Sequence, residues 1–220
     1  MIDHDAAHLA LRARAAGLIV CTTGAIALSA TATGYHRTAG SFVTDGFKAG
    51  MEVTPAGFAN NGVSIIAQVT ASDLTTVTPQ VIEASAGGRT LTVGFPSLTA
   101  DENIDFTPIP NRPYAEEDFV PATHVLTSAT ADQGVAEETG LYAIRYYGLE
   151  KYGSTGIRKL MTALAALFTP GTALTAGANV VRIRSDSSTV AGQVLPHGDG
   201  WAVCTLNIRW RAESLNAIAA

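Results

Sequence analysis

Hydrophobic and polar positions divide the chain into three stretches of different character. In the first, the apolar positions recur every three or four residues: Ile2, Ala6, Leu9, Ala13 and Ala16. This spacing places them on one face of an α-helix. Asp3 is suited to cap the start of this helix, and Gly17 to close its end. The pattern predicts a helix over residues 3–16.

In the second stretch, residues 18–98, short β-prone runs alternate with turn signals. Asp45-Gly46, Asn61-Gly62 and Gly87-Gly88 mark turns. Residues 63–70 alternate between two faces directly after the second of these turns, as a strand of a hairpin does. Several short strands at this spacing predict a small antiparallel barrel or sandwich.

The third stretch follows a polar segment, residues 99–113, which three prolines make stiff and extended. Residues 157–168 have one apolar helical face, and Pro170-Gly171 ends that helix. On the last strand, the even-numbered residues from Ala202 to Trp210 share one face. A loop is predicted at residues 128–139, and the predicted strands are 119–127, 141–147, 180–184, 190–195 and 201–210.

The order of these elements predicts two domains. We expect the first helix and the third stretch to form one α+β domain, made of residues 1–17 and 99–220. Residues 18–98 would then be an all-β domain inserted into it. An insertion is tolerated when the chain enters and leaves it at neighbouring points. We therefore expect the inserted domain to be dispensable for the folding of the rest.

The composition is that of a folded protein, since 47% of the residues are hydrophobic and only 15% are charged. A net charge of −5 without a basic stripe argues against a nucleic-acid-binding domain. Cys21 and Cys204 lie in apolar runs, where we expect buried free thiols. We find no signal peptide and no membrane-spanning run, and expect a soluble protein of a reducing cytoplasm.

The charges are distributed unevenly along the chain. Residues 99–139 contain nine acidic residues and one base, Arg112, whereas residues 145–184 contain six bases and one acid, Glu150. Two interpretations remain open. The segments could be solvated faces of the fold, or they could be complementary surfaces for self-association.

No catalytic motif is apparent, neither Gly-x-Ser-x-Gly nor Gly-x-x-x-x-Gly-Lys-Ser/Thr. His4 and His8 have the spacing of zinc ligands on a helix, but Asp5 stands where a metalloprotease has Glu, and no third ligand is near. We interpret both histidines as solvent-facing. The carboxylates at residues 116–118 and 137–138 could hold Mg²⁺ or act as acid and base, but we interpret them as solvated charge runs.

Aromatic and charged residues of the third stretch are typical of a protein interface. For the aromatic residues, core packing is the alternative. The candidate residues for a contact with a ring neighbour or a tube are Tyr146, Tyr147, Lys151, Tyr152, Glu137, Glu138, Arg182 and Arg184.

Four features occur in a fixed order along the chain, beginning with the N-terminal amphipathic helix. The others are Pro-Tyr-Ala-Glu-Glu-Asp-Phe-Val-Pro-Ala at 113–122, Glu-Thr-Gly-Leu-Tyr-Ala-Ile at 138–144, and Phe-Thr-Pro-Gly-Thr at 168–172 with Val-Val-Arg-Ile at 180–183 and Gly-Asp-Gly-Trp…Ile-Arg-Trp at 198–210. In this order they resemble the tail-terminator family of long-tailed bacteriophages. The resemblance covers residues 1–17 and 105–220. Residues 18–98 depart from the small terminators and are similar to β-barrel modules of phage tail proteins.

The resemblance implies an α+β domain, with a mixed or antiparallel sheet packed with two helices, and an inserted all-β domain. It implies a structural protein of the virion tail and neck, not an enzyme, without cofactor or metal. Such a protein caps the tail tube, stops its polymerisation and joins it to the head–tail connector. The alternatives are another tail or neck protein (a tube subunit or connector stopper) and a small enzyme or metal-binding module.

The implied partners are further copies in a homohexameric ring, the major tail tube protein and the head–tail connector or stopper protein. Genomic DNA would pass through the lumen without specific binding, and no membrane is involved. Assembly would take place in the cytoplasm of the bacterial host.

Overall fold

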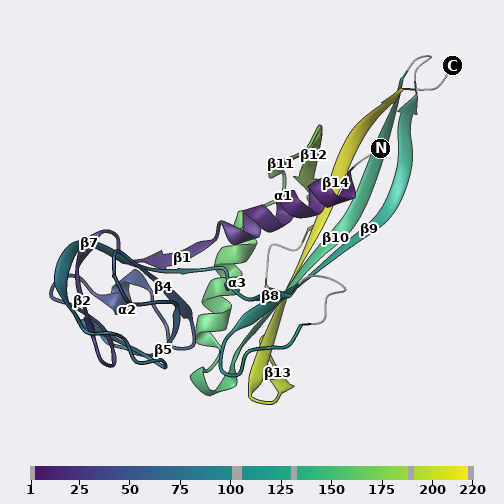
Figure 1. Ribbon diagram of the computed structural model, residues 1–220. Helices are drawn as coiled ribbons and strands as arrows, with labels where there is room; N and C mark the ends of the chain where they lie inside the picture. The colour runs from purple at the N-terminus through teal and green to yellow at the C-terminus, as the bar shows by residue number, and fades with distance from the viewer. Residues whose placement is uncertain (1–2, 101–105, 130–132, 188–190, 218–220) are drawn as a thin grey trace.

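The computed structural model describes residues 3–100, 106–129, 133–187 and 191–217. A closed β-barrel lies at one end of the molecule, and three long strands of an open sheet extend to the other end (Figure 1). Helix α3 (Thr155–Leu167) stands between the barrel and the sheet. The predicted α+β fold with an all-β insertion is confirmed. Within the described ranges, no helix is long and apolar enough to cross a membrane.

Six strands, β2 to β7, close the barrel, and β1 pairs with β7 outside the ring. The elements of this region are β1 (Ile19–Thr22), β2 (Ile26–Thr31), β3 (Gly34–Arg37), α2 (Phe42–Asp45), β4 (Glu52–Ala56), β5 (Ser64–Val69), β6 (Asp73–Thr76) and β7 (Glu83–Gly94). The strand order is β1-β7-β2-β3-β6-β5-β4, and β4 also pairs with β7, which closes the ring. Large side chains fill the interior, among them Tyr35, Phe42 and Phe47, which are almost fully buried.

The open sheet follows the barrel along the chain. Its strands are β8 (Thr99–Ala100), β9 (Tyr114–Ala129), β10 (Gln133–Leu149), β11 (Ala173–Ala176), β12 (Asn179–Ile183), β13 (Leu195–Gly198) and β14 (Trp201–Ala217). Their order is β11-β12-β14-β10-β9-β8, and β13 pairs with β14. The pairs are antiparallel except β8–β9, so the sheet is mixed.

Two helices cover one face of this sheet, α1 (His4–Ala16) and α3, which follows the short η1 (Glu150–Tyr152). The even-numbered residues of β14 from Ala202 to Trp210 are buried on this face, as predicted. The Trp210 ring stacks on Phe119 at 5.1 Å and lies over Gly140. A Cβ at Gly140 would come within 2.4 Å of the ring, so this strand position requires glycine.

The predicted helix at the N-terminus is present, but its predicted face is wrong. Asp3 caps it by accepting a hydrogen bond from the Ala6 amide, and Gly17 follows its end. The buried residues, however, are Ala7, Leu11 and Ala15, while Leu9 is 61% exposed. The helix turns its histidines and Arg12 toward partners on the sheet, and these contacts outweigh the weak apolar stripe.

The strands of the third stretch are longer than the sequence predicts. Residues 128–139, expected as a loop, belong largely to β9 and β10, with 130–132 outside the described residues. β13 covers 195–198 instead of 190–195, of which residue 190 is not described. β11 was not expected. Pairing with β14 and with each other fixes these segments, and such non-local contacts override local preference.

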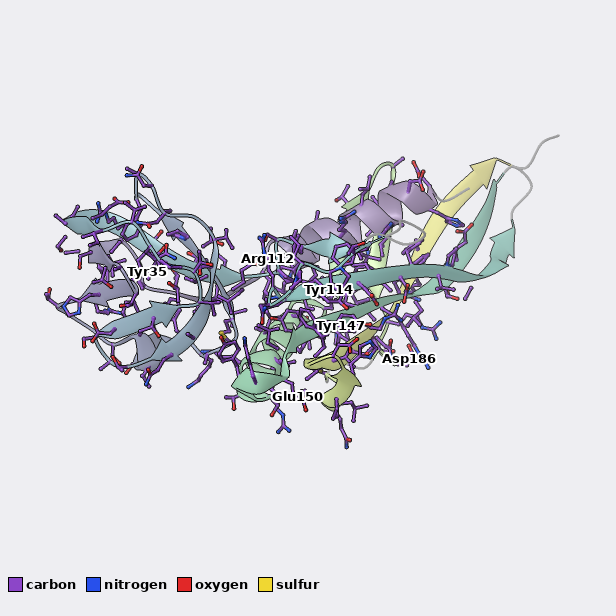
Figure 2. The ribbon with its side chains drawn as sticks, turned by 60° about the horizontal axis from the view of Figure 1, so that its bottom comes forward. Tyr35, Arg112, Tyr114, Tyr147, Glu150 and Asp186 are labelled. Carbon is purple, nitrogen blue, oxygen red and sulfur yellow. The ribbon has the colours of Figure 1, made fainter. Side chains whose placement is uncertain are left out.

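Hydrogen bonds join the barrel to the rest of the chain. Glu52 of β4 is buried and accepts from the Ser97 amide at 2.9 Å and from Arg112 Nε at 3.0 Å. Figure 2 shows Arg112 between the barrel and the sheet. On α3, Lys159 Nζ donates to the Gly46 carbonyl at 2.7 Å. The barrel is thus held at two places, and its independent folding stays a prediction.

Candidate assembly surface

The open sheet has a second, polar face that is turned away from the two helices. Directly opposite residues of antiparallel strands share a face. Asn207 and Arg209 of β14 are exposed on this outer face, and Leu141 and Arg145 of β10 are half-buried there. Polar side chains on the uncovered face of a sheet are available to a partner protein.

The β9 side of the outer face is acidic. Glu116 and Asp118 of β9, each with a 32% exposed side chain, pair with Arg145 of β10 at 3.1 and 2.8 Å. Tyr147 donates its hydroxyl hydrogen to Glu116 at 2.7 Å. One arginine serves two carboxylates here, so this edge keeps a negative balance.

The opposite side, β12 and β14, is basic. Arg182 of β12 lies directly opposite Arg211 of β14 in the strand register. Next to them, Arg184 and Arg209 share Asp186, with N···O distances of 2.8 to 3.1 Å. The hydrogen bonds from Arg184 and then Arg209 hold the pKa of Asp186 below its ordinary value. The outer face is therefore polarised from acidic to basic across its strands.

A hollow of about 420 Å³ opens on the basic side, and we call it the arginine hollow. Its lining residues are Glu137, Gly171, Arg182, Ile183, Arg184, Ser185 and Arg211. Three of the seven are arginines and one is acidic, which makes the hollow suited to an anionic group.

Aromatic side chains gather at the other end of the outer face. The Tyr114 and Tyr147 rings stack at 4.4 Å, and Figure 2 shows them close together on the sheet. Trp201 meets Tyr114 edge-on at 5.3 Å, and His197 meets Tyr147 at 4.9 Å. Burial raises the pKa of Tyr114 to about 12, with Glu116 adding to the effect. Burial also raises the pKa of Tyr147, so both hydroxyls stay neutral at physiological pH.

A second hollow of about 540 Å³ adjoins this aromatic group. Trp201, Leu149 and two prolines of the segment after β8 give it apolar walls. Asn111 and Asp199, which also line it, have φ angles of 61° and 50°. Glu150 donates its backbone N–H to the Gly200 carbonyl at 2.8 Å, which ties two walls together. We call this the aromatic hollow.

The two hollows lie at opposite ends of the same strands. Glu137 lines the arginine hollow near the start of β10, and Leu149 lines the aromatic hollow at its end. Twelve residues of extended strand separate them, or roughly 40 Å. The sheet thus carries two chemically different hollows, one toward each end of β10.

The family model described as "Phage tail terminator protein" matches residues 81–210, which is more than half of the chain. The chain belongs to the phage tail terminator family. The protein is thus a structural component of a phage tail. The match takes in β7 of the barrel and nearly all of the open sheet, and it leaves out α1.

Comparison with solved structures adds little to this terminator assignment. One structure is 22% identical, over 54% of this chain and 79% of that one, with a TM-score of 0.40. A likeness this slight carries no argument. No curated protein matches the terminator.

The fold brings three of the predicted interface residues together in one place: Glu137, Arg182 and Arg184 line the arginine hollow. Lys151 lines the aromatic hollow and donates to Asn111 Oδ1 at 3.0 Å. Tyr152 is half-buried against Gly50 of the barrel.

The other predicted residues lie inside the terminator. Tyr146 is a core residue, 2% exposed, and burial raises the pKa of its hydroxyl. Tyr147 is 4% exposed beneath the aromatic group. Glu138 is buried, and its side chain lies 2.6 Å from His4 Nε2. Core packing, the alternative for the tyrosines, therefore describes both Tyr146 and Tyr147.

The prediction that His8 and Glu117 are solvated is also corrected, whereas Glu116 and Asp118 are partly exposed. Glu117 is only 1% exposed, on the inner face of β9, with Arg12 Nε at 3.6 Å and His8 Nε2 at 3.8 Å. The His8 ring stacks on Phe119 at 5.2 Å. The two histidines fasten α1 to the sheet, because each faces a buried carboxylate. Within the described ranges, no group of three or more His, Cys, Asp or Glu side chains could hold a metal ion.

Sequence reasoning missed Arg211 as a surface residue. The signal was present, since the alternation of the last strand assigns odd-numbered residues to the outer face and continues to Arg211. What it lacked was the pairing of β14 with β12, which brings Arg211 beside Arg182.

Proposed function

We propose that this protein caps the tail tube, stops its polymerisation and joins it to the head–tail connector in the neck. Membership in the terminator family carries the proposal. The two hollows support it, because a terminator needs one contact site for the tube and another for the connector. Their different chemistry would keep the two partners from exchanging places.

The protein would act as a closed homo-oligomer, a hexameric ring. Head-to-tail contacts whose rotation closes generate such rings. The acidic β9 side and the basic β12–β14 side are complementary, so that one subunit's acidic edge can meet its neighbour's basic edge. Glu116 and Asp118 on one side and Arg209 on the other are candidates for this contact, together with the predicted Lys151 and Tyr152.

Genomic DNA would pass through the lumen of the ring without specific binding. The net charge of −5 supports this, since a basic lumen would hold the phosphates of the DNA. Assembly would take place in the cytoplasm of the bacterial host, and the finished protein would lie in the virion neck.

The second candidate is another tail or neck structural protein, either a tube subunit or a connector stopper. The open sheet edge favours it, because an unpaired edge can also support continued polymerisation. A tube subunit would form long cylinders without help, whereas a terminator would not.

The test is the length of tail tubes assembled with and without the protein. The cognate tube protein is polymerised alone and with increasing amounts of the terminator, and lengths are measured by negative-stain microscopy. We expect the mean length to fall as the terminator is added, with rings in the free protein or at tube ends. Unchanged lengths would contradict capping, and cylinders grown by this chain alone would identify a tube subunit.

A further inference from the structure

The arginine hollow contains two guanidinium groups that the fold places side by side. Arg182 and Arg211 are direct cross-strand neighbours, an arrangement that is unfavourable for like charges. Arg182 is exposed, and its guanidinium makes no hydrogen bond or ion pair with any residue that the structure describes. Arg211 faces Glu137, but at 3.6 Å the contact is longer than a hydrogen bond. Glu137 therefore offsets part of the Arg211 charge, whereas the charge of Arg182 has no partner among the described residues.

The neighbouring arginines, Arg184 and Arg209, show how a carboxylate can pair with two adjacent guanidinium groups. Arg184 donates two hydrogen bonds to Asp186, one to each carboxylate oxygen, and Arg209 donates a third. The planar guanidinium matches the two oxygens of a carboxylate, which makes these bonds directional as well as strong. Arg182 and Arg211 have the same chemistry and the same cross-strand closeness, but lack the equivalent of Asp186.

We propose that the arginine hollow is a binding site for one or two carboxylate side chains from an acidic segment of a partner protein. Arg182 and Arg211 hold the carboxylates, and Ser185 at the rim is placed to donate a further hydrogen bond. The identity of the partner, a tail or neck protein, rests on the proposed function. The hollow and its chemistry do not.

The observations favour carboxylates over the phosphates of DNA. A nucleic-acid surface needs a continuous basic stripe that follows many phosphates. Here Glu137 lines the hollow, and Glu213 lies opposite Glu137 in the strand register. These acids limit the positive area to one small site, about 420 Å³ in volume. The site accommodates a few side-chain atoms rather than a polymer backbone.

The experiment measures the binding of a fluorescent hexaglutamate peptide to the full chain by anisotropy at low salt. A hexaglutamine peptide of the same length is the matched probe. Arg182→Ala and Arg211→Ala remove the proposed contacts. Arg158→Ala is the matched control, because Arg158 is an exposed arginine of α3 outside the hollow. Circular dichroism verifies that each variant is folded.

We expect hexaglutamate to bind at least about tenfold more tightly than hexaglutamine, and each hollow variant to weaken binding about tenfold. Arg158→Ala should change the affinity by less than about twofold. Arg182→Lys keeps the charge but loses the planar, two-pronged donor geometry of the guanidinium, so its affinity should lie between those of the wild type and Arg182→Ala. Absence of a preference for hexaglutamate, or an equal loss from Arg158→Ala, would overturn the proposal. A short DNA duplex that binds more tightly than the peptide and depends on Arg182 would overturn it in favour of a phosphate site.

The outcome is separable from that of the tube-length test. Peptide binding that depends on Arg182, with tubes of unchanged length, would support the carboxylate site and refute capping. Shortened tubes without selective peptide binding would refute the hollow alone.

Discussion

The barrel and the open sheet solve the problem of strand edges in opposite ways. In the barrel, β7, β2, β3, β6, β5 and β4 each have a neighbour on both sides, because β4 pairs back to β7. In the sheet, β8 covers only the stretch of β9 that carries Ala115 and Glu116, and β11 has β12 as its single neighbour in the described order. A closed barrel contacts other proteins through side chains, whereas an open sheet can also use its backbone.

The two regions differ in their charges as well. Two arginine ion pairs of the barrel are internal, since Arg89 binds Glu83 and Arg37 binds Asp45, and a third, from Glu52 to Arg112, joins the barrel to the rest of the chain. On the sheet, the acidic and basic groups lie on different sides of one exposed face, and Arg182 has no internal partner in the described structure. A region whose strand edges and charges are mostly paired internally suits a spacer or decoration. A region with unpaired strand edges and charges suits assembly.

Removing the barrel is the strongest test of whether the two regions fold independently. Ile19 of β1 pairs with Gly94 of β7, so a short Gly-Ser linker can replace residues 19–94 while Leu18 and Phe95 keep their places against the sheet core. We expect the variant to unfold in one cooperative transition in urea, followed by circular dichroism. A non-cooperative, molten product would show instead that the two regions share one core.

Core truncations provide a paired test of independence. Trp210→Ala in the sheet should lower the free energy of unfolding by about 3–5 kcal/mol, and Leu28→Ala in the barrel by about 2–5 kcal/mol, because both side chains are fully buried. Each substitution should move only the transition of its own region in urea. Equal shifts of both transitions would mean that the regions unfold as one unit.

The sequence predicted features that depend on local periodicity better than features that depend on contacts between distant segments. The alternation from Ala202 to Trp210 and the helix ending near Pro170 depend on local periodicity, and both are present. The face of α1 could not be read correctly, because its alanines are weakly apolar and its orientation depends on Phe119 and Glu117 of β9.

The candidate site was only partly predictable for the same reason. Arg182 and Arg184 were found because they are charged residues on a strand. Their grouping with Arg211 depends on strand order, which joins residues that are far apart in the chain. Glu117 was taken as solvated because strand β9 was expected to begin at Phe119. A strand starting at Tyr114 puts Ala115, Glu117 and Phe119 on one face, and that face is buried.

The two cysteines give one chemical reporter for each region. Cys21 is buried in the barrel cluster and Cys204 in the sheet cluster. Burial raises the pKa of Cys21 to about 11 and also raises that of Cys204. At pH 8 the folded barrel should therefore slow alkylation of Cys21 at least about 100-fold, because so little thiolate is present.

Pulsed alkylation with mass spectrometry across a urea series measures this protection. Trp210→Ala should expose Cys204 at lower urea and leave Cys21 unchanged. The pH dependence has a definite sign. The raised folded pKa of Cys21 stabilises the protein below pH 9, and this contribution is lost as the pH rises from about 9 to about 11. Rapid labelling of folded Cys21 at pH 8 would contradict its burial.

The smallest expected effects are at exposed apolar residues, one in each region. Ile82 of the barrel is 72% exposed and Leu9 of α1 is 61% exposed. Ile82→Ser and Leu9→Ser should each change the free energy of unfolding by less than about 0.5 kcal/mol. A loss of more than about 1 kcal/mol of unfolding free energy from Leu9→Ser would show that Leu9 is buried, as the sequence alone predicts.

The most direct test of the account is the position of this protein on an assembled tail. Electron cryomicroscopy of tubes formed with the full chain locates it without any assumption about affinity. We expect a single closed ring at one end of the tube, with the open sheets in contact with the last tube ring and the barrels outside that contact. Copies distributed along the tube, or no ring at either end, would contradict the assignment of capping to this chain.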